Sequence, residues 1–93
     1  MTSKIQSYIG FAIKSRNIVF GYDNLVKFKS KYMLVLYDDT LSVKVQDRLI
    51  MLAQSHHWDI IKLPYTIESV INRNCKALGI IDVNLSNAIK QNI

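Results

Sequence analysis

The feature that most constrains the fold of this sequence is a run of apolar residues, Tyr-Met-Leu-Val-Leu-Tyr, at positions 32–37. Its apolar character is continuous rather than alternating, which is typical of a strand covered on both faces. A layer of helices on each side of a sheet is the usual way to cover both faces. The run therefore predicts a central strand enclosed between helices, and it ends at the polar residues Asp38, Asp39 and Thr40.

Three more short apolar runs alternate with segments of helical periodicity. Strands are expected at 18–20, 58–63 and 77–81, where β-branched residues are frequent. Helices are expected at 3–16, 23–30, 42–56, 66–72 and from 84 onwards, where apolar residues recur at helical spacing. The order αβαβαβαβα predicts an α/β fold, namely a three-layer α/β/α sandwich with a four-stranded, mostly parallel (mixed) sheet.

Residues with special backbone or capping preferences mark several element ends. Asn17 is expected in the left-handed conformation that often ends a helix, and Gly21 allows a sharp turn after the first strand. Asp39 and Thr40 are expected to cap the helix at 42–56, Thr66 the short helix at 66–72, and Asn84 the last helix.

The charge is positive and unevenly distributed. The 93 residues carry a formal net charge of +5, and the first 31 hold six cations against one acid. A basic lobe of this kind indicates a polyanionic partner. On charge alone, a solubilising surface explains the same pattern equally well.

The length and the apolar runs set the broad class of protein. Ninety-three residues are enough for one domain with one sheet. The apolar runs are far too short to span a bilayer, and no apolar stretch of a secretory signal follows Met1. The lone Cys75 allows no internal disulfide. We expect a single-domain cytoplasmic protein without a membrane partner.

The segment from Ile18 to Lys27 reads as a strand, a glycine turn and a helix start, where backbone N–H groups suit an anion. Asp23, Asn24 and Lys27 should share one face of that helix. Because many basic residues lie at helix ends and turns, we expect several of them at the same edge of the sandwich. These cations are Lys14, Arg16, Lys27, Lys29, Lys31, Arg73 and Lys76.

No constellation of residues predicts catalysis. Asp38-Asp39-Thr40 follows a strand, where a phospho-acceptor or Mg²⁺ site can lie, but helix capping is a sufficient reason for these residues. His56 and His57 are adjacent and cannot share one helix face as metal ligands. Cys75 has no nearby base in the sequence. We therefore expect no enzyme activity, no metal, no cofactor and no small-molecule substrate.

The order of elements and the residues at their junctions resemble the kink-turn RNA-binding ribosomal-protein family. This family comprises the archaeal "L seven Ae" protein, its small bacterial relatives and the eukaryotic "L thirty e" proteins. The likeness spans nearly the whole chain and depends on the joint order of several segments. These are residues 8–14, Val19-Phe20-Gly21 followed by Leu25-Val26-Lys27, residues 34–39 ending in Asp39, residues 66–70, and Ile80-Ile81-Asp82 with Leu85.

The resemblance implies a single RNA-binding domain of ribosomal-protein type over residues 1–93. It would be non-catalytic and ribosome-associated, and would bind structured, kink-turn-like RNA, ribosomal or other. The helix start at Gly21–Lys27 would grip one side of the RNA and the Arg73–Lys76 loop the other. The candidate RNA contacts are Lys14, Arg16, Gly21, Asp23, Asn24, Lys27, Lys31, Asp39, Arg73, Asn74 and Lys76.

The signature turn departs from the family pattern at one pair. Where the family has Asn-Glu to contact tandem G·A pairs, this chain has Asp23-Asn24. Asn24 can donate to a guanine edge and accept from it, but it lacks the charge-assisted bond of a carboxylate. Two alternatives stay open: a protein-interaction module on the same fold, and a substrate-recruiting domain like those attached to some RNA methyltransferases.

Overall fold

The computed structural model describes residues 3–28 and 31–93, and helices and strands alternate along them in the predicted order. The elements are α1 (Ser3–Lys14), β1 (Ile18–Phe20), α2 (Tyr22–Phe28), β2 (Leu34–Tyr37), α3 (Val43–His56), β3 (Ile60–Lys62), α4 (Ile67–Ile71), β4 (Ala77–Ile80) and α5 (Val83–Gln91). None of these helices is long and apolar enough to cross a membrane.

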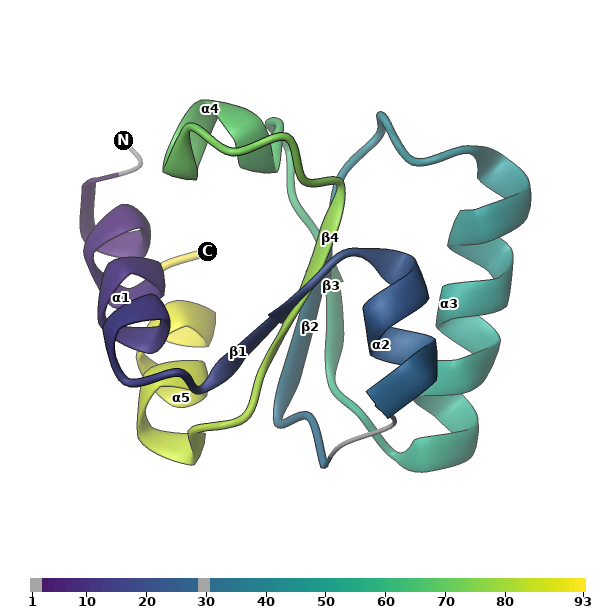
Figure 1. The fold of residues 1–93 in the computed structure, drawn as a ribbon, viewed down its shortest axis with the longest axis horizontal. Helices are drawn as coiled ribbons and strands as arrows, with labels where there is room; N and C mark the ends of the chain where they lie inside the picture. The colour runs from purple at the N-terminus through teal and green to yellow at the C-terminus, as the bar shows by residue number, and fades with distance from the viewer. Residues whose placement is uncertain (1–2, 29–30) are drawn as a thin grey trace.

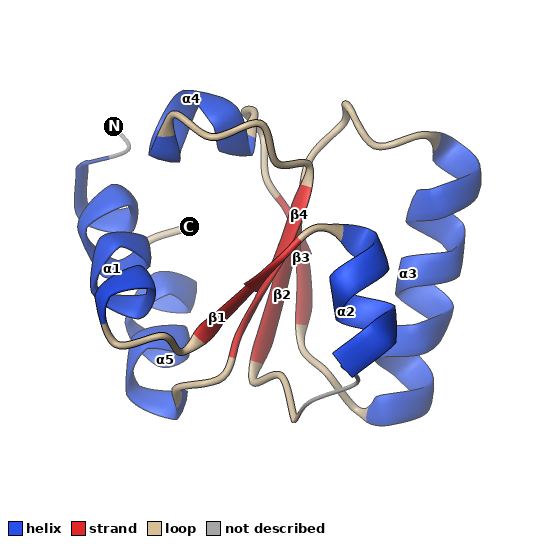
Figure 2. Cartoon of the chain, viewed as in Figure 1, coloured by secondary structure: helices blue, strands red, loops and turns tan. Residues whose placement is uncertain are grey.

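The elements form three layers, as predicted. Helices α1, α4 and α5 cover one face of the sheet, and α2 and α3 cover the other (Figure 1, Figure 2). Alternate residues of β2 enter the two cores, with Leu34 and Leu36 on the α1 side and Val35 and Tyr37 on the α3 side. All four residues of β2 are buried, which confirms the strand covered on both faces.

The sheet is mixed, with the strand order β1-β4-β2-β3. β2 pairs with β3 in parallel, whereas β4 lies antiparallel to both β1 and β2. Strands β1, β2 and β3 therefore run in one direction and β4 runs against them between β1 and β2. The mixed sheet is confirmed, but the expectation of a mostly parallel sheet is wrong for the pairing, which is mainly antiparallel.

The direction of β4 follows from the shortness of α4. A parallel strand needs a crossover that carries the chain back along the whole sheet, usually a helix. Helix α4 has five residues, or about 8 Å of rise, and it lies across the end of the sheet where β3 finishes (Figure 1). The chain therefore enters β4 at the end where it left β3.

Three capping predictions were wrong, each by one to three positions. Arg16, not Asn17, adopts the left-handed conformation (φ 59°), because the carbonyl of Asn17 already accepts from Ile81 N–H at the start of sheet pairing. Ser42 caps α3 in place of Asp39 and Thr40, and Asp82 caps α5 in place of Asn84. Thr66 caps α4 as predicted, accepting from Ser69 N–H at 3.2 Å.

Candidate nucleic-acid interface

We call the end of the sheet where β1, β2 and β3 finish and β4 begins the upper edge, and the opposite end the lower edge. The upper edge is uppermost in Figure 1 and carries the turn at Gly21, the Asp38–Leu41 turn, α4 and the 72–76 loop. In open α/β sheets, ligands bind outside the carboxyl ends of the parallel strands. The upper edge is therefore where a binding site is expected.

The turn at Gly21 joins β1 to α2. Gly21 has a φ of +86°, which a residue with a side chain adopts only with strain. Its N–H donates to Ala77 O at 2.8 Å, and its carbonyl accepts from Leu25 N–H at 3.0 Å. The N–H of Gly21 is therefore hydrogen-bonded to β4 and does not face a ligand. The turn contributes to the site by setting where α2 begins.

The polar face of α2 is exposed as predicted. Asp23, Asn24 and Lys27 are all exposed, and Lys27 lies in the last turn of the helix. The side-chain amide of Asn24 donates to Phe20 O at 2.9 Å, so Asn24 is tied back to the end of β1. The Lys27 ammonium lies 5.7 Å from the ring centroid of Phe28.

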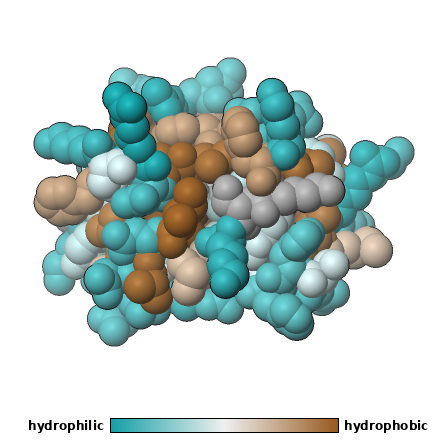
Figure 3. Space-filling view, turned by 60° about the horizontal axis from the view of Figure 1, so that its bottom comes forward, coloured by the Kyte–Doolittle hydropathy of each residue, from teal (hydrophilic) through white to brown (hydrophobic). Residues whose placement is uncertain are grey.

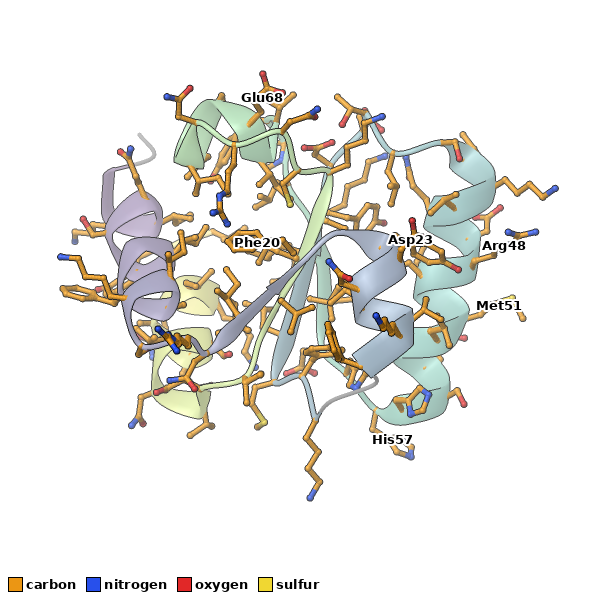
Figure 4. The ribbon with its side chains drawn as sticks, viewed as in Figure 1. Phe20, Asp23, Arg48, Met51, His57 and Glu68 are labelled. Carbon is orange, nitrogen blue, oxygen red and sulfur yellow. The ribbon has the colours of Figure 1, made fainter. Side chains whose placement is uncertain are left out.

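The 72–76 loop is brought against the same strand end. The guanidinium carbon of Arg73 lies 4.3 Å from the ring centroid of Phe20, a cation–π distance. Phe20 lies at the end of β1, with its side chain below α4 on the face of the sheet that α1, α4 and α5 cover (Figure 4). The carbonyl of Lys76 accepts from Asp38 N–H at 3.2 Å. The two segments expected to grip RNA thus meet at the Gly21 turn, which lies 52 positions before Arg73 in the sequence.

Two open clefts share this loop. A cleft of about 280 Å³ lies between the loop and the start of α2, lined by Gly21 and Tyr22 together with Asn74 and Lys76. A larger cleft of about 590 Å³ lies on the α4 side and is also lined by Asn74 and Lys76. Its other polar groups include Gln6, Asp38, Thr40, Thr66 and Glu68. The exposed residues Asn74 and Lys76 therefore contribute to both clefts.

The two acids after β2 have different roles. Asp39 is exposed and its carboxylate lies 2.7 Å from Lys62 Nζ; this hydrogen bond holds the pKa of Asp39 below its ordinary value. Asp38 is buried and accepts from Ile67 N–H at 2.7 Å and from Thr40, through both its N–H and its hydroxyl. The sequence offered one signal for Asp38, a threonine two residues after an aspartate, as in an Asx turn.

Not all predicted site residues lie at the upper edge. Lys14 and Arg16 precede β1 and Lys31 precedes β2, so these three exposed cations lie at the lower edge. The expectation that all the basic residues share one edge with the site is therefore wrong for these three. The chain lies at the lower edge before β1 and returns there after α2, which is where these cations fall. Lys29 lies outside the described residues.

Cys75 lies in the wall of both clefts but is buried. Its thiol lies 2.8 Å from the carbonyl oxygen of Ala77, to which it donates, and burial raises its pKa above the ordinary value. A buried thiol with a raised pKa is a poor nucleophile. Over residues 3–28 and 31–93, moreover, no three His, Cys, Asp or Glu side chains gather as a metal site requires.

Cys75 should therefore resist alkylation in the folded protein. We expect iodoacetamide to react with it at least about tenfold more slowly in buffer than in concentrated urea, because burial removes both access and the thiolate. Mass spectrometry of timed samples measures the rate, and the variant Cys75→Ala gives the background. Equal rates in the two conditions would show that the loop does not cover the thiol.

Comparisons with known proteins show the fold alone. No protein-family model matches the sequence, and no curated protein does. Among solved structures 81 chains match. One is a protein of unknown function from Bacillus halodurans, with a TM-score of 0.79 and 16% identity over 92% of each chain. At that identity the likeness supports the α/β sandwich and says nothing of a ligand.

Proposed function

We propose that this chain is a non-catalytic RNA-binding protein that holds structured, internally looped RNA at the upper edge of its sheet. The observation that carries the proposal is the grouping of exposed Arg73, Asn74 and Lys76 in the loop beside the Gly21 turn, where Asn74 and Lys76 line two open clefts and Arg73 lies over Phe20. The family resemblance of the sequence supports it. A cytoplasmic, ribosome-associated setting is part of the proposal and depends on that resemblance.

The residue types suit a looped RNA. An internal loop exposes base edges that a continuous helix hides, and an amide such as Asn74 can both donate to a base edge and accept from it. Arg73 and Lys76 supply positive charge for phosphates, which set the position of the protein on the RNA. The acids Asp23 and Glu68, on α2 and α4, repel phosphates on either side of this group (Figure 4). The RNA backbone would therefore approach over the 72–76 loop.

The test is a pair of substitutions in that loop. We expect Arg73→Gln together with Lys76→Gln to weaken binding of a kink-turn RNA by more than about tenfold, since one hydrogen bond to a charged group contributes about 1.5–3 kcal/mol. Affinity is measured by titration of labelled RNA at moderate salt, with an uninterrupted duplex RNA for comparison. Wild-type protein should prefer the kink-turn RNA, and the double variant should lose that preference.

The control is Lys44→Gln with Arg48→Gln, which removes the same charge from exposed positions on α3. It should keep the preference for kink-turn RNA. The proposal is wrong if wild-type protein binds no RNA at moderate salt, or if the loop variant and the α3 variant bind alike.

A second candidate function, binding of a protein partner, is favoured by a groove between α2 and α3. The groove has a volume of about 430 Å³ and apolar walls from Tyr22, Val26, Met51 and Leu52. Met51 is 68% exposed and points away from the core (Figure 4). Exposed apolar surface of this kind often marks a protein contact. If Met51→Glu abolishes capture of a partner from cell extract while RNA binding is absent, this function replaces the first.

A further inference from the structure

The lower edge joins three exposed cations that are far apart in the sequence. The carbonyl of Asn17 accepts from Ile81 N–H at 2.9 Å, and Met33 N–H donates to Ile80 O at 2.8 Å. The segments that carry Lys14, Arg16 and Lys31 are therefore fixed to the two sides of the end of β4. With a strand spacing near 4.8 Å, the backbones on the two sides lie about 10 Å apart.

These cations are not neutralised within the described part of the chain. The two ion pairs found there join Lys62 to Asp39 and Lys90 to Asp59. The acids at the lower edge have other partners: Asp59 forms an ion pair with Lys90, and Asp82 caps α5. The upper edge, in contrast, mixes exposed Arg73 and Lys76 with two exposed acids that neither of these ion pairs engages, Asp23 and Glu68. The unpaired positive charge of the predicted basic lobe is thus found mainly at the lower edge.

The backbone of Arg16 gives a second, independent observation. Arg16 is exposed and holds a φ of 59°, a conformation in which glycine or asparagine is favoured after a helix and a longer side chain is strained. Strained residues persist where the fold over-determines them and are frequent at functional sites. An arginine at this position supplies a positive charge at the lower edge that glycine, the residue favoured there, would not supply.

We infer that the lower edge is a second RNA contact, which takes the phosphate backbone of a double-helical segment. That the polyanion is RNA rests on the proposed function. None of the three clefts described above is lined by Lys14, Arg16 or Lys31, so this edge offers charge rather than a pocket for a base. Its surface carries hydrophilic side chains around an apolar strip (Figure 3).

The two contacts lie at opposite ends of the sheet, in a molecule whose Cα extents are 30 × 24 × 21 Å. A straight RNA helix that lies across the upper edge does not reach the lower edge, on the far side of the sheet. The protein would therefore join two helical arms, or two RNA segments, with its upper edge reading an internal loop and its lower edge holding a duplex.

The first experiment compares two triple variants of equal charge. The lower-edge variant is Lys14→Gln, Arg16→Gln and Lys31→Gln; the control is Lys4→Gln, Lys44→Gln and Arg48→Gln, at exposed helix positions. Binding of duplex RNA and of kink-turn RNA is measured over a series of salt concentrations. Each lost phosphate contact makes the negative slope of log K against log salt shallower by about 0.9. We therefore expect the slope of the lower-edge variant to be shallower by about 2 to 3 than that of wild-type protein, on both RNAs. The control should keep most of the wild-type slope.

The outcomes separate this inference from the proposed function. If wild-type protein prefers kink-turn RNA but the two triple variants have equal slopes, the lower-edge contact is overturned and the upper-edge site stands. If wild-type protein shows no such preference, yet the lower-edge variant alone loses duplex binding, the upper-edge site fails and the lower-edge contact stands. Lower-edge-dependent binding of polyglutamate without binding of RNA would overturn the choice of partner.

The second experiment uses the strain at Arg16. Arg16→Gly removes the charge and relaxes the backbone, whereas His57→Gly relaxes the same conformation (φ 59°) at the end of α3 without removing a lysine or arginine. We expect both variants to melt a few degrees higher than wild-type protein. Only Arg16→Gly should make the slope of log K against log salt shallower, by about 1, on duplex RNA. A wild-type slope for Arg16→Gly would exclude this residue from the contact.

Discussion

Replacing Gly79 by alanine is expected to destabilise the protein by about 2–3 kcal/mol, the upper part of the range for overpacked cores. A Cβ atom at this position would lie 2.7 Å from Leu25 Cδ2 and 2.7 Å from Tyr32 Cδ1. Both neighbours are buried, with exposures of 0% and 2%, so neither can move aside into solvent. Urea denaturation measures the loss, which should appear as a lower midpoint with an unchanged slope.

The substitution should also affect the upper edge. Leu25 belongs to α2, and the hydroxyl of Tyr32 donates to Leu25 O at 3.3 Å, so a displaced pair carries the helix with it. Gly10→Ala is the matched control, because nothing lies within 4 Å of its added Cβ and α1 gains a better helix former. We expect Gly10→Ala to be at least as stable as wild-type protein. If Gly79→Ala is equally stable, α2 does not pack on β4 as closely as described.

The parts of the fold that depend on local pattern could be predicted from the sequence. The apolar run at 32–37 correctly predicted a strand buried on both faces, which is Leu34–Tyr37. Continuous apolar character indicates such burial at any position in a sheet. Thr66 was correctly predicted as a helix cap. A cap of this kind is local, because the polar side chain accepts a hydrogen bond from the backbone N–H three residues later, here that of Ser69. The antiparallel direction of β4 was missed, although the helix expected at 66–72 is already too short to carry the chain back along the whole sheet.

The candidate site was predictable only as a set of segments. That the Gly21 turn and the 72–76 loop meet depends on the pairing of β1 with β4, which no local pattern encodes. The position of Lys14, Arg16 and Lys31 at the other edge follows from the same pairing. Asn17 was a reasonable residue for the left-handed position, but its carbonyl is engaged by Ile81, so the conformation falls one residue earlier, on Arg16.

Asp38→Ala is expected to cost about 3–4 kcal/mol of folding free energy. The Asp38 carboxylate is 1% exposed and accepts from the backbone N–H of Thr40 at 2.9 Å and of Ile67 at 2.7 Å. A hydrogen bond to a charged group contributes about 1.5–3 kcal/mol, and its loss leaves a buried N–H on Ile67, itself fully buried, without a partner. Urea denaturation again measures the change. Asp38→Asn, which keeps the shape and one acceptor oxygen, should lie between alanine and wild type.

The neighbouring acid provides the control that decides what Asp38 does. Asp39→Ala removes the same charge at an exposed position, so its urea midpoint should stay close to the wild-type value. Because Asp38 ties the end of β2 to the start of α4, and the 72–76 loop follows α4, its loss should also weaken RNA binding in conditions where the variant is still folded. Asp39→Ala leaves α4 anchored, so its RNA binding should fall by less than that of Asp38→Ala. Equal stability of the two variants would mean that the carboxylate of Asp38 does not anchor α4.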